Sequence, residues 1–129
     1  MSKDLEEKMR KLIHFAFEKK AQNLIVFNLQ GKSVLTDFLI ICSGQGEMHT
    51  KAIAKNVILK AKEHGIHLDH NEGLENGQWI LLDFIDVIVH IFEQKKREFY
   101  KLEELWECIP QLKFVDEESK IEFFSHREP

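Results

Sequence analysis

Two apolar runs separated by one residue constrain the fold more than any other feature of the sequence. Residues 79–84 read Trp-Ile-Leu-Leu-Asp-Phe, and residues 86–92 read Asp-Val-Ile-Val-His-Ile-Phe. Both runs have the length of a strand and are rich in β-branched and aromatic residues, so they predict an antiparallel hairpin that turns at Ile85. Because side chains alternate across a strand, one face of the first run carries Trp79, Leu81 and Asp83, and the apolar residues between them face the other way.

The rest of the chain alternates helical patterns with short apolar runs. The expected elements are a helix over 4–20, strands over 23–27 and 37–41, a helix over 47–64, a strand over 66–70, the hairpin, and a helix over 98–106. The Ser-Gly-Gln-Gly turn at residues 43–46 is expected to end the second strand. A helix joins the strands at 37–41 and 66–70, so these two should pair in parallel. The order predicts an α+β fold with a mixed sheet of about five strands and helices packed on it.

Length and composition fit a single small domain. The chain has 129 residues, 43% of them hydrophobic, which is enough for one core. Pro110 is expected to end the domain, giving a folded domain over residues 1–110 and a C-terminal extension over 111–129, either a docked strand or a mobile tail. Two cysteines are too few for a disulfide framework, and no apolar run reaches the ~18 residues of a membrane span. We therefore expect a cytoplasmic protein without a membrane segment.

Charge narrows the class of partner. The chain holds 18 basic and 22 acidic residues, a formal net charge of −4 with histidine neutral. This balance argues against a protein whose affinity comes from neutralising a phosphate backbone. It leaves open a basic protein as the partner.

Three groups of residues could carry chemistry, and each has a simpler explanation. The turn at 43–46 could hold a phosphate at a helix N-terminus, but such turns are common at strand–helix junctions. Asp83 and Asp86 could hold a metal ion, yet they flank a hairpin turn and do not form the Asp-x-Asp pair of nucleotidyltransferases. The histidines at positions 64, 67 and 70 lie across a helix end and a turn, so nothing fixes their convergence. No metal, cofactor or catalytic residue is predicted.

The strongest candidate is a surface of the hairpin. The face with Trp79 and Leu81 places apolar anchors beside acidic side chains, a combination that suits a basic protein partner. The simpler alternative is that Trp79 only covers the edge of the sheet. His90 lies in the second apolar run, and no serine or cysteine can be matched to it to complete a catalytic triad.

These segments resemble one known family. Residues 36–44, Thr-Asp-Phe-Leu-Ile-Ile-Cys-Ser-Gly, are similar to the Thr-Asp-aromatic…Cys-Ser-Gly strand of the ribosomal silencing factor family, also called RsfS or Iojap. The resemblance spans about residues 5–108, with further matches in order at residues 52–54, 72–73, 77–83, 86–92, 97–100 and 102–106. The chain departs from the family at Phe38, where Tyr is usual, and at Ile85, where Gly is usual. A β-branched residue disfavours the positive φ that a glycine in such a turn allows.

The resemblance implies a non-enzymatic factor with a nucleotidyltransferase-like fold that lacks the catalytic motif. Such factors bind the large ribosomal subunit through its ribosomal protein number fourteen. They sterically block joining of the small subunit and so slow translation under nutrient limitation. The resemblance implies no cofactor and little direct contact with nucleic acid. It leaves open whether the free protein forms a homodimer.

Seven residues are the expected partner-binding set. Trp79 and Leu81 would be apolar anchors, and Asp83 and Asp86 would pair with Lys or Arg of the partner. The set is completed by His90, Thr36 and Asp37.

The alternative hypothesis is a small nucleotidyltransferase-like, nucleotide-binding enzyme. It would use the Ser43-Gly44 turn together with the carboxylates of Asp83 and Asp86.

Overall fold

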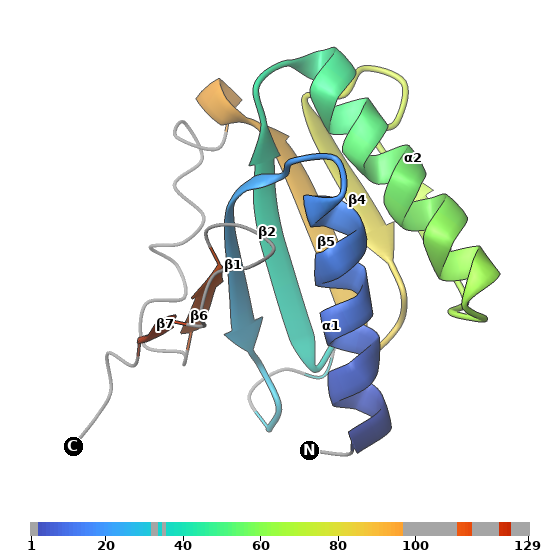
Figure 1. Ribbon diagram of the computed structural model, residues 1–129, viewed down its shortest axis with the longest axis vertical. Helices are drawn as coiled ribbons and strands as arrows, with labels where there is room; N and C mark the ends of the chain where they lie inside the picture. Colours follow the sequence, from blue (N-terminus) through green and yellow to red (C-terminus); the bar gives the residue numbers. More distant parts are fainter. Residues whose placement is uncertain (1–2, 32–33, 35, 97–110, 115–121, 125–129) are drawn as a thin grey trace.

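The computed structural model describes residues 3–31, 34, 36–96, 111–114 and 122–124 (Figure 1). The elements are α1 (Lys3–Phe17), β1 (Gln22–Asn28), β2 (Phe38–Gly44), α2 (Glu47–Glu63), β3 (His70–Glu72), β4 (Trp79–Asp83), β5 (Val87–Glu93), β6 (Gln111–Phe114) and β7 (Glu122–Phe124). Residues 94–96, directly after β5, are also helical. Neither α1 nor α2 has the length and apolar character needed to cross a bilayer.

The strands form one mixed sheet in the order β3-β4-β5-β2-β1-β6-β7. β2 and β5 pair in parallel, and every other neighbouring pair is antiparallel. α1 and α2 contact each other and lie on the same face of the sheet (Figure 1). The predicted α+β class, with helices packed on a mixed sheet, is therefore confirmed.

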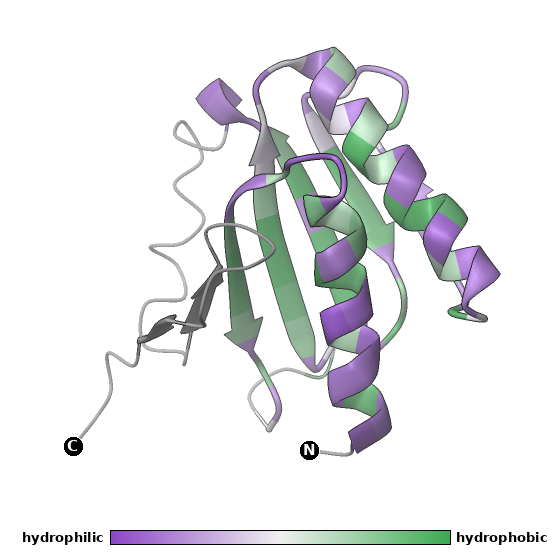
Figure 2. Ribbon diagram, in the orientation of Figure 1, coloured by the Kyte–Doolittle hydropathy of each residue, from purple (hydrophilic) through white to green (hydrophobic). Residues whose placement is uncertain are grey.

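The main core lies between the two helices and the sheet. The strands behind the helices are hydrophobic along most of their length, whereas the helices turn hydrophilic residues outward (Figure 2). The predicted alternation of the first hairpin strand holds, because Ile80, Leu82 and Phe84 are fully buried in this core. The side chains that alternate with them point to the opposite face, which we call the outer face of the sheet.

The strand expected at residues 66–70 is wrong in both position and partner. β3 begins at His70 and pairs antiparallel with β4 at the edge of the sheet. The parallel partner of β2 is β5. The reason is burial, since all three residues of β3 are exposed, while four of the seven residues of β5 are buried and the other three are half-buried. The central position goes to the strand that has apolar side chains for both faces.

Other boundaries differ less. Ser43 and Gly44 continue β2 instead of ending it, so the turn is confined to the next two residues. Strands β1 to β5 give the expected five-stranded sheet from residues 22–93, and β6 and β7 extend it at the β1 edge. Of the two alternatives for residues 111–129, strands are thus present at 111–114 and 122–124. The helix expected over 98–106 lies outside the described residues.

The tip of the β4–β5 hairpin is a strained turn. The Asp86 N–H donates to the Phe84 carbonyl at 3.1 Å, so Ile85 is the central residue of a γ-turn, with φ of 77°. The Ile85 N–H donates to Asp83 Oδ1 at 2.7 Å, and Thr36 Oγ1 donates to the Ile85 carbonyl at 3.1 Å. These side chains hold a β-branched residue in a conformation that L-residues rarely adopt.

Replacing Ile85 by glycine should stabilise the protein. Relief of the strained φ is worth about 1–3 kcal/mol, and the extra freedom of glycine in the unfolded chain offsets about 0.5–1 kcal/mol of it. Ile85 is 53% exposed, so little packing is lost. We expect the Ile85→Gly variant to gain about 1 kcal/mol in urea unfolding. Ile85→Ala, which keeps the Cβ, is the control, and a glycine variant less stable than the alanine variant would contradict the strain argument.

Candidate functional site

Three rows of cross-strand pairs build the outer face of the β4–β5 hairpin. Trp79 pairs with Phe92, Leu81 with His90, and Asp83 with Ile88. Neither α1 nor α2 lies on this face, because both cover the other one (Figure 1). Trp79 is 37% exposed, Phe92 is fully buried, and the remaining apolar members are half-buried. We call the accessible side chains Trp79, Leu81, Ile88 and His90 the outer patch.

Trp79 is fixed in place by its neighbours on β5. Its indole Nε1 donates a hydrogen bond of 2.8 Å to His90 Nδ1. Its ring stacks on Phe92 with 5.0 Å between ring centroids and an interplanar angle of 26°. The indole therefore covers Phe92 and still presents more than a third of its surface to solvent. Trp79 thus acts as a cover within the fold, and its expected role as a partner anchor stays a prediction.

His90 is held in the neutral form. Burial lowers the pKa of the imidazole to about 4, against a smaller opposing effect from the Glu72 carboxylate. A neutral ring is also what the geometry requires, since Nδ1 needs a free lone pair to accept the Trp79 N–H. The proton of the neutral ring then lies on Nε2.

Stability should consequently fall in mild acid. The unfolded histidine has a pKa of about 6.5, above the folded value of about 4. The stabilisation from neutral His90 is thus complete above the unfolded pKa and is lost as the pH falls towards 4. We expect this group to remove up to about 3 kcal/mol of unfolding free energy between pH 7 and pH 4.

The matched variant is His90→Asn. The asparagine Oδ1 occupies the position of the acceptor Nδ1 and does not titrate, so urea unfolding at several pH values should show a shallower acid loss in this variant. If the unfolding free energy of the variant falls with pH as steeply as that of the natural protein, His90 is not the cause of the acid loss.

The other predicted residues gather at the hairpin tip. Thr36 is only 8% exposed, and its hydroxyl is used within the fold. The backbone N–H of Asp37 donates to the Asp86 carbonyl at 3.0 Å. Asp86 Oδ2 lies 3.9 Å from Nζ of Lys8, and that ammonium also donates to the Phe84 carbonyl at 2.7 Å. Thr36 therefore positions the tip, whereas the carboxylate of Asp86, 43% exposed, faces solvent.

The predicted set is thus divided between two neighbouring places. Trp79, Leu81 and His90 lie together in the outer patch, and Asp83 connects that patch to the tip, where Thr36, Asp37 and Asp86 lie. Sequence reasoning missed Ile88, which pairs with Asp83 on the same face. The sequence contained the signal for Ile88. Residues two apart in a strand point to the same face, so Ile88, His90 and Phe92 were expected to share one.

The constellation of the alternative enzyme is not assembled. Ser43 pairs with Phe92 at one end of β5, whereas Asp83 and Asp86 flank the turn beyond Val87 at the other end. Five residues of strand, about 17 Å, separate the two ends. Ser43 is also fully buried, and a Cβ at Gly44 would lie 2.9 Å from the Thr50 backbone N. The turn is packed against α2, so the expected joint use of Ser43-Gly44 with these carboxylates is wrong.

The three histidines at 64, 67 and 70 do not converge. His64 packs against Phe15 of α1, with ring centroids 5.1 Å apart. His70 lies among carboxylates at the edge of the sheet, and its pKa is raised by its hydrogen bond with Glu72 and by the neighbouring Asp69 and Asp83.

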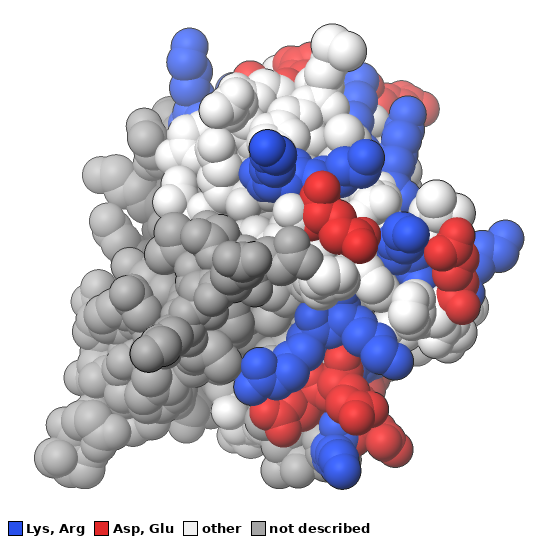
Figure 3. Space-filling view, viewed as in Figure 1, with Lys and Arg blue, Asp and Glu red and all other residues white. Residues whose placement is uncertain are grey.

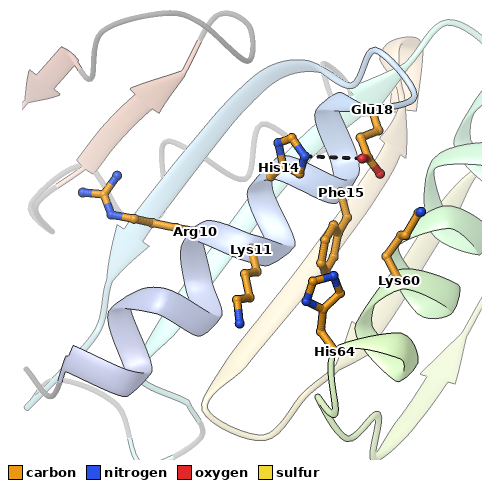
Figure 4. Close-up of a pocket in the computed structure, with 7 residues that line it drawn as sticks. All are labelled: Arg10, Lys11, His14, Phe15, Glu18, Lys60 and His64. Carbon is orange, nitrogen blue, oxygen red and sulfur yellow. Dashed lines mark ion pairs between the residues drawn. The ribbon is translucent and has the colours of Figure 1, made fainter.

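A shallow groove of about 320 Å³ separates α1 from α2 (Figure 4). Glu18 forms an ion pair with His14 at 3.3 Å and accepts a hydrogen bond from Asn56 Nδ2 at 2.9 Å. The bond from Asn56 is the main cause of the lowered pKa of Glu18. Lys, Arg and acidic side chains intermingle on this helical face (Figure 3), so the face does not present a single sign of charge. The groove opens away from the outer patch.

Comparison with known proteins identifies the family. The family model described as ribosomal silencing factor during starvation matches residues 2–128. The chain belongs to the ribosomal silencing factor family. It is 36% identical over 105 residues to the ribosomal silencing factor of Halalkalibacterium halodurans, covering 81% of this chain and 90% of that relative. Membership places the chain among regulatory, ribosome-associated proteins that silence translation.

Two further comparisons extend this result. A solved protein of Chromobacterium violaceum matches with a TM-score of 0.78 at 25% identity and covers 98% of each chain. A mouse relative, named mitochondrial assembly of ribosomal large subunit protein 1, is 26% identical over 98 residues, covering 74% of this chain and 43% of the mouse protein. The silencing factor fold is thus confirmed by a solved relative. None of these comparisons tests the expected likeness to nucleotidyltransferases, which stays a prediction.

Proposed function

We propose that this silencing factor binds the large ribosomal subunit through ribosomal protein number fourteen. Bound there, it sterically blocks joining of the small subunit and slows translation when nutrients are limiting. It acts by occupancy in the cytoplasm, without a cofactor. The family and the name of the mouse relative, which refers to the large subunit, support the choice of ribosomal particle.

The observation that carries this proposal is the outer patch. A pre-positioned tryptophan on an otherwise half-buried apolar surface has the character of an interface hot spot, because the indole contributes contact area and loses little freedom on binding. The hydrogen bond to His90 and the stack on Phe92 set its orientation before any partner arrives.

Charge around the patch indicates the chemistry of the partner. Residues 65–93 contain six acidic residues and no lysine or arginine. Two of them, Asp83 and Asp86, flank the hairpin tip with side chains that are 21% and 43% exposed. An acidic rim around an apolar centre complements a basic protein and steers its approach. The same charges repel a phosphate backbone, so direct contact with ribosomal RNA has little part in the proposal.

Truncating Trp79 should weaken binding to the large subunit while the protein stays folded. We expect Trp79→Ala to weaken binding to purified large subunits by about 30-fold, or about 2 kcal/mol. Trp79→Phe keeps an aromatic ring over Phe92 and should lose less binding affinity than Trp79→Ala. Leu59→Ala is the matched control, since Leu59 is 54% exposed on α2, on the opposite face of the molecule.

Co-sedimentation with each ribosomal subunit measures the binding, and the yield of joined subunits on a gradient measures the block. Urea unfolding of the same variants gives the folded fraction. A folded Trp79→Ala protein that binds the large subunit normally would remove the outer patch from the proposal.

We further propose that residues 1–110 form the binding domain and that the C-terminal extension contributes little. The first strand of the extension, β6, pairs with β1. β6 lies four strand spacings from β4, or about 19 Å across the sheet. A chain that ends at residue 110 should bind the large subunit within tenfold of the full chain, although β1 then pairs with β2 alone and the protein becomes less stable. A larger loss, compared at equal folded fraction, would show that the extension belongs to the interface.

A further inference from the structure

Three side chains with metal-ligating atoms converge at the β3–β4 edge. The Nδ1 of His70 and one carboxylate oxygen each of Asp69 and Asp83 all lie within 4.8 Å of one another. Asp69 and His70 are exposed, and Asp83 is half-buried. The cluster borders the outer patch, since Asp83 belongs to the same face as Leu81.

The separations suit ligands of one ion. His70 Nδ1 lies 3.5 Å from Asp69 Oδ2 and 3.4 Å from Asp83 Oδ2. Neighbouring ligand atoms in a tetrahedral site with bonds of 2.0–2.1 Å are about 3.3–3.4 Å apart. A direct charge-assisted hydrogen bond between nitrogen and carboxylate is shorter, about 2.7–2.9 Å. Two oxygens therefore flank one ring nitrogen at separations that are compatible with one shared cation.

Backbone contacts hold all three ligands in register. The N–H of Asp69 donates to the Asp83 carbonyl at 2.7 Å, and His70 is the cross-strand partner of Asp83. Asp83 Oδ1 already accepts the Ile85 N–H, which leaves Oδ2 facing His70 Nδ1. The site is thus built from a strand pair and a turn, without a long mobile connection.

Glu72 completes the arrangement on the far side of the imidazole. Its Oε2 lies 3.2 Å from His70 Nε2. Histidines that bind metals commonly donate their second ring N–H to a carboxylate, which fixes the tautomer and directs the free lone pair at the metal. When Glu72 holds the Nε2 proton, a metal ion between the two aspartates would take the lone pair of Nδ1 in place of a proton.

We propose that Asp69, His70 and Asp83 bind one divalent transition-metal ion of the Zn²⁺ class, with Glu72 as a positioning residue. One imidazole and two carboxylates favour such ions over Mg²⁺ and Ca²⁺, which prefer all-oxygen sites. Water would fill the remaining coordination positions. The site shares Asp83 with the acidic rim of the outer patch, but metal binding can be measured on the isolated protein without the ribosome.

Calorimetric titration of the full chain with Zn²⁺ at pH 7.5 tests the proposal. We expect one equivalent to bind to the natural protein, and His70→Ala and Asp69→Asn to weaken it at least tenfold. Glu72→Gln should cost about tenfold through the orientation of the ring. His67→Ala is the matched control, since His67 is an exposed histidine three residues away that lies outside the cluster, and this variant should bind as the natural protein does. Circular dichroism confirms that each variant is folded.

Three results would overturn the site. The first is no binding of Zn²⁺ to the natural protein, and the second is equal affinity in the natural protein and His70→Ala. The third is a thiolate charge-transfer band in the absorption spectrum of the Co²⁺-loaded protein, which would assign the ion to a cysteine. Mg²⁺ titrated in the same way should bind more weakly, and Mg²⁺ binding as tight as that of Zn²⁺ would contradict the imidazole ligand.

Discussion

The parallel pairing of β2 with β5 is the constraint on which the rest of the structure depends. Seven consecutive pairs, from Phe38–Val87 to Gly44–Glu93, join segments about fifty residues apart in the chain. Every residue of β2 is buried, so this ladder forms the centre of the sheet. It places Thr36 and Asp37 beside the β4–β5 hairpin tip and Ser43 at the opposite end. The same register therefore assembles the tip and keeps the serine away from the carboxylates.

One-sided packing of the helices then determines what the molecule can present. Both α1 and α2 cover the same face of the sheet. The hairpin therefore has an all-apolar row of side chains on the helical side and a mixed apolar and acidic set on the outer face. Trp79 is central to that set, because it is at once bonded to His90, stacked on Phe92 and exposed to solvent. A silencing factor that acts by occupancy needs a rigid surface more than it needs a catalytic group, and this arrangement supplies one.

The hairpin and its two faces could be predicted from the sequence, because residues 79–92 form two apolar runs of strand length. In a strand, side chains alternate between the two faces of the sheet. The position of β3 could not be predicted from the sequence. Residues 66–70 contain only Ile66 and Leu68 as apolar strand formers, and these side chains pack against the core although their backbone joins no strand. The error concealed the His70–Asp83 pair, which depends on that register. The role of Thr36 in holding the hairpin tip could not be predicted either, because its partner Ile85 is 49 residues away in the chain. Ile85 itself carried a signal, since the resemblance implied a glycine at this position and the structure has a positive φ there.

Photo-crosslinking tests most directly that the outer face is the docking surface. A photoreactive phenylalanine analogue is placed at Leu81 in the outer patch and, in a second protein, at Leu59 on the exposed side of α2. Each protein is mixed with purified large ribosomal subunits and irradiated, and the crosslinked ribosomal protein is identified by mass spectrometry. The account predicts a crosslink from position 81 to ribosomal protein number fourteen and none from position 59. A crosslink to that protein from position 59, with none from position 81, would contradict it.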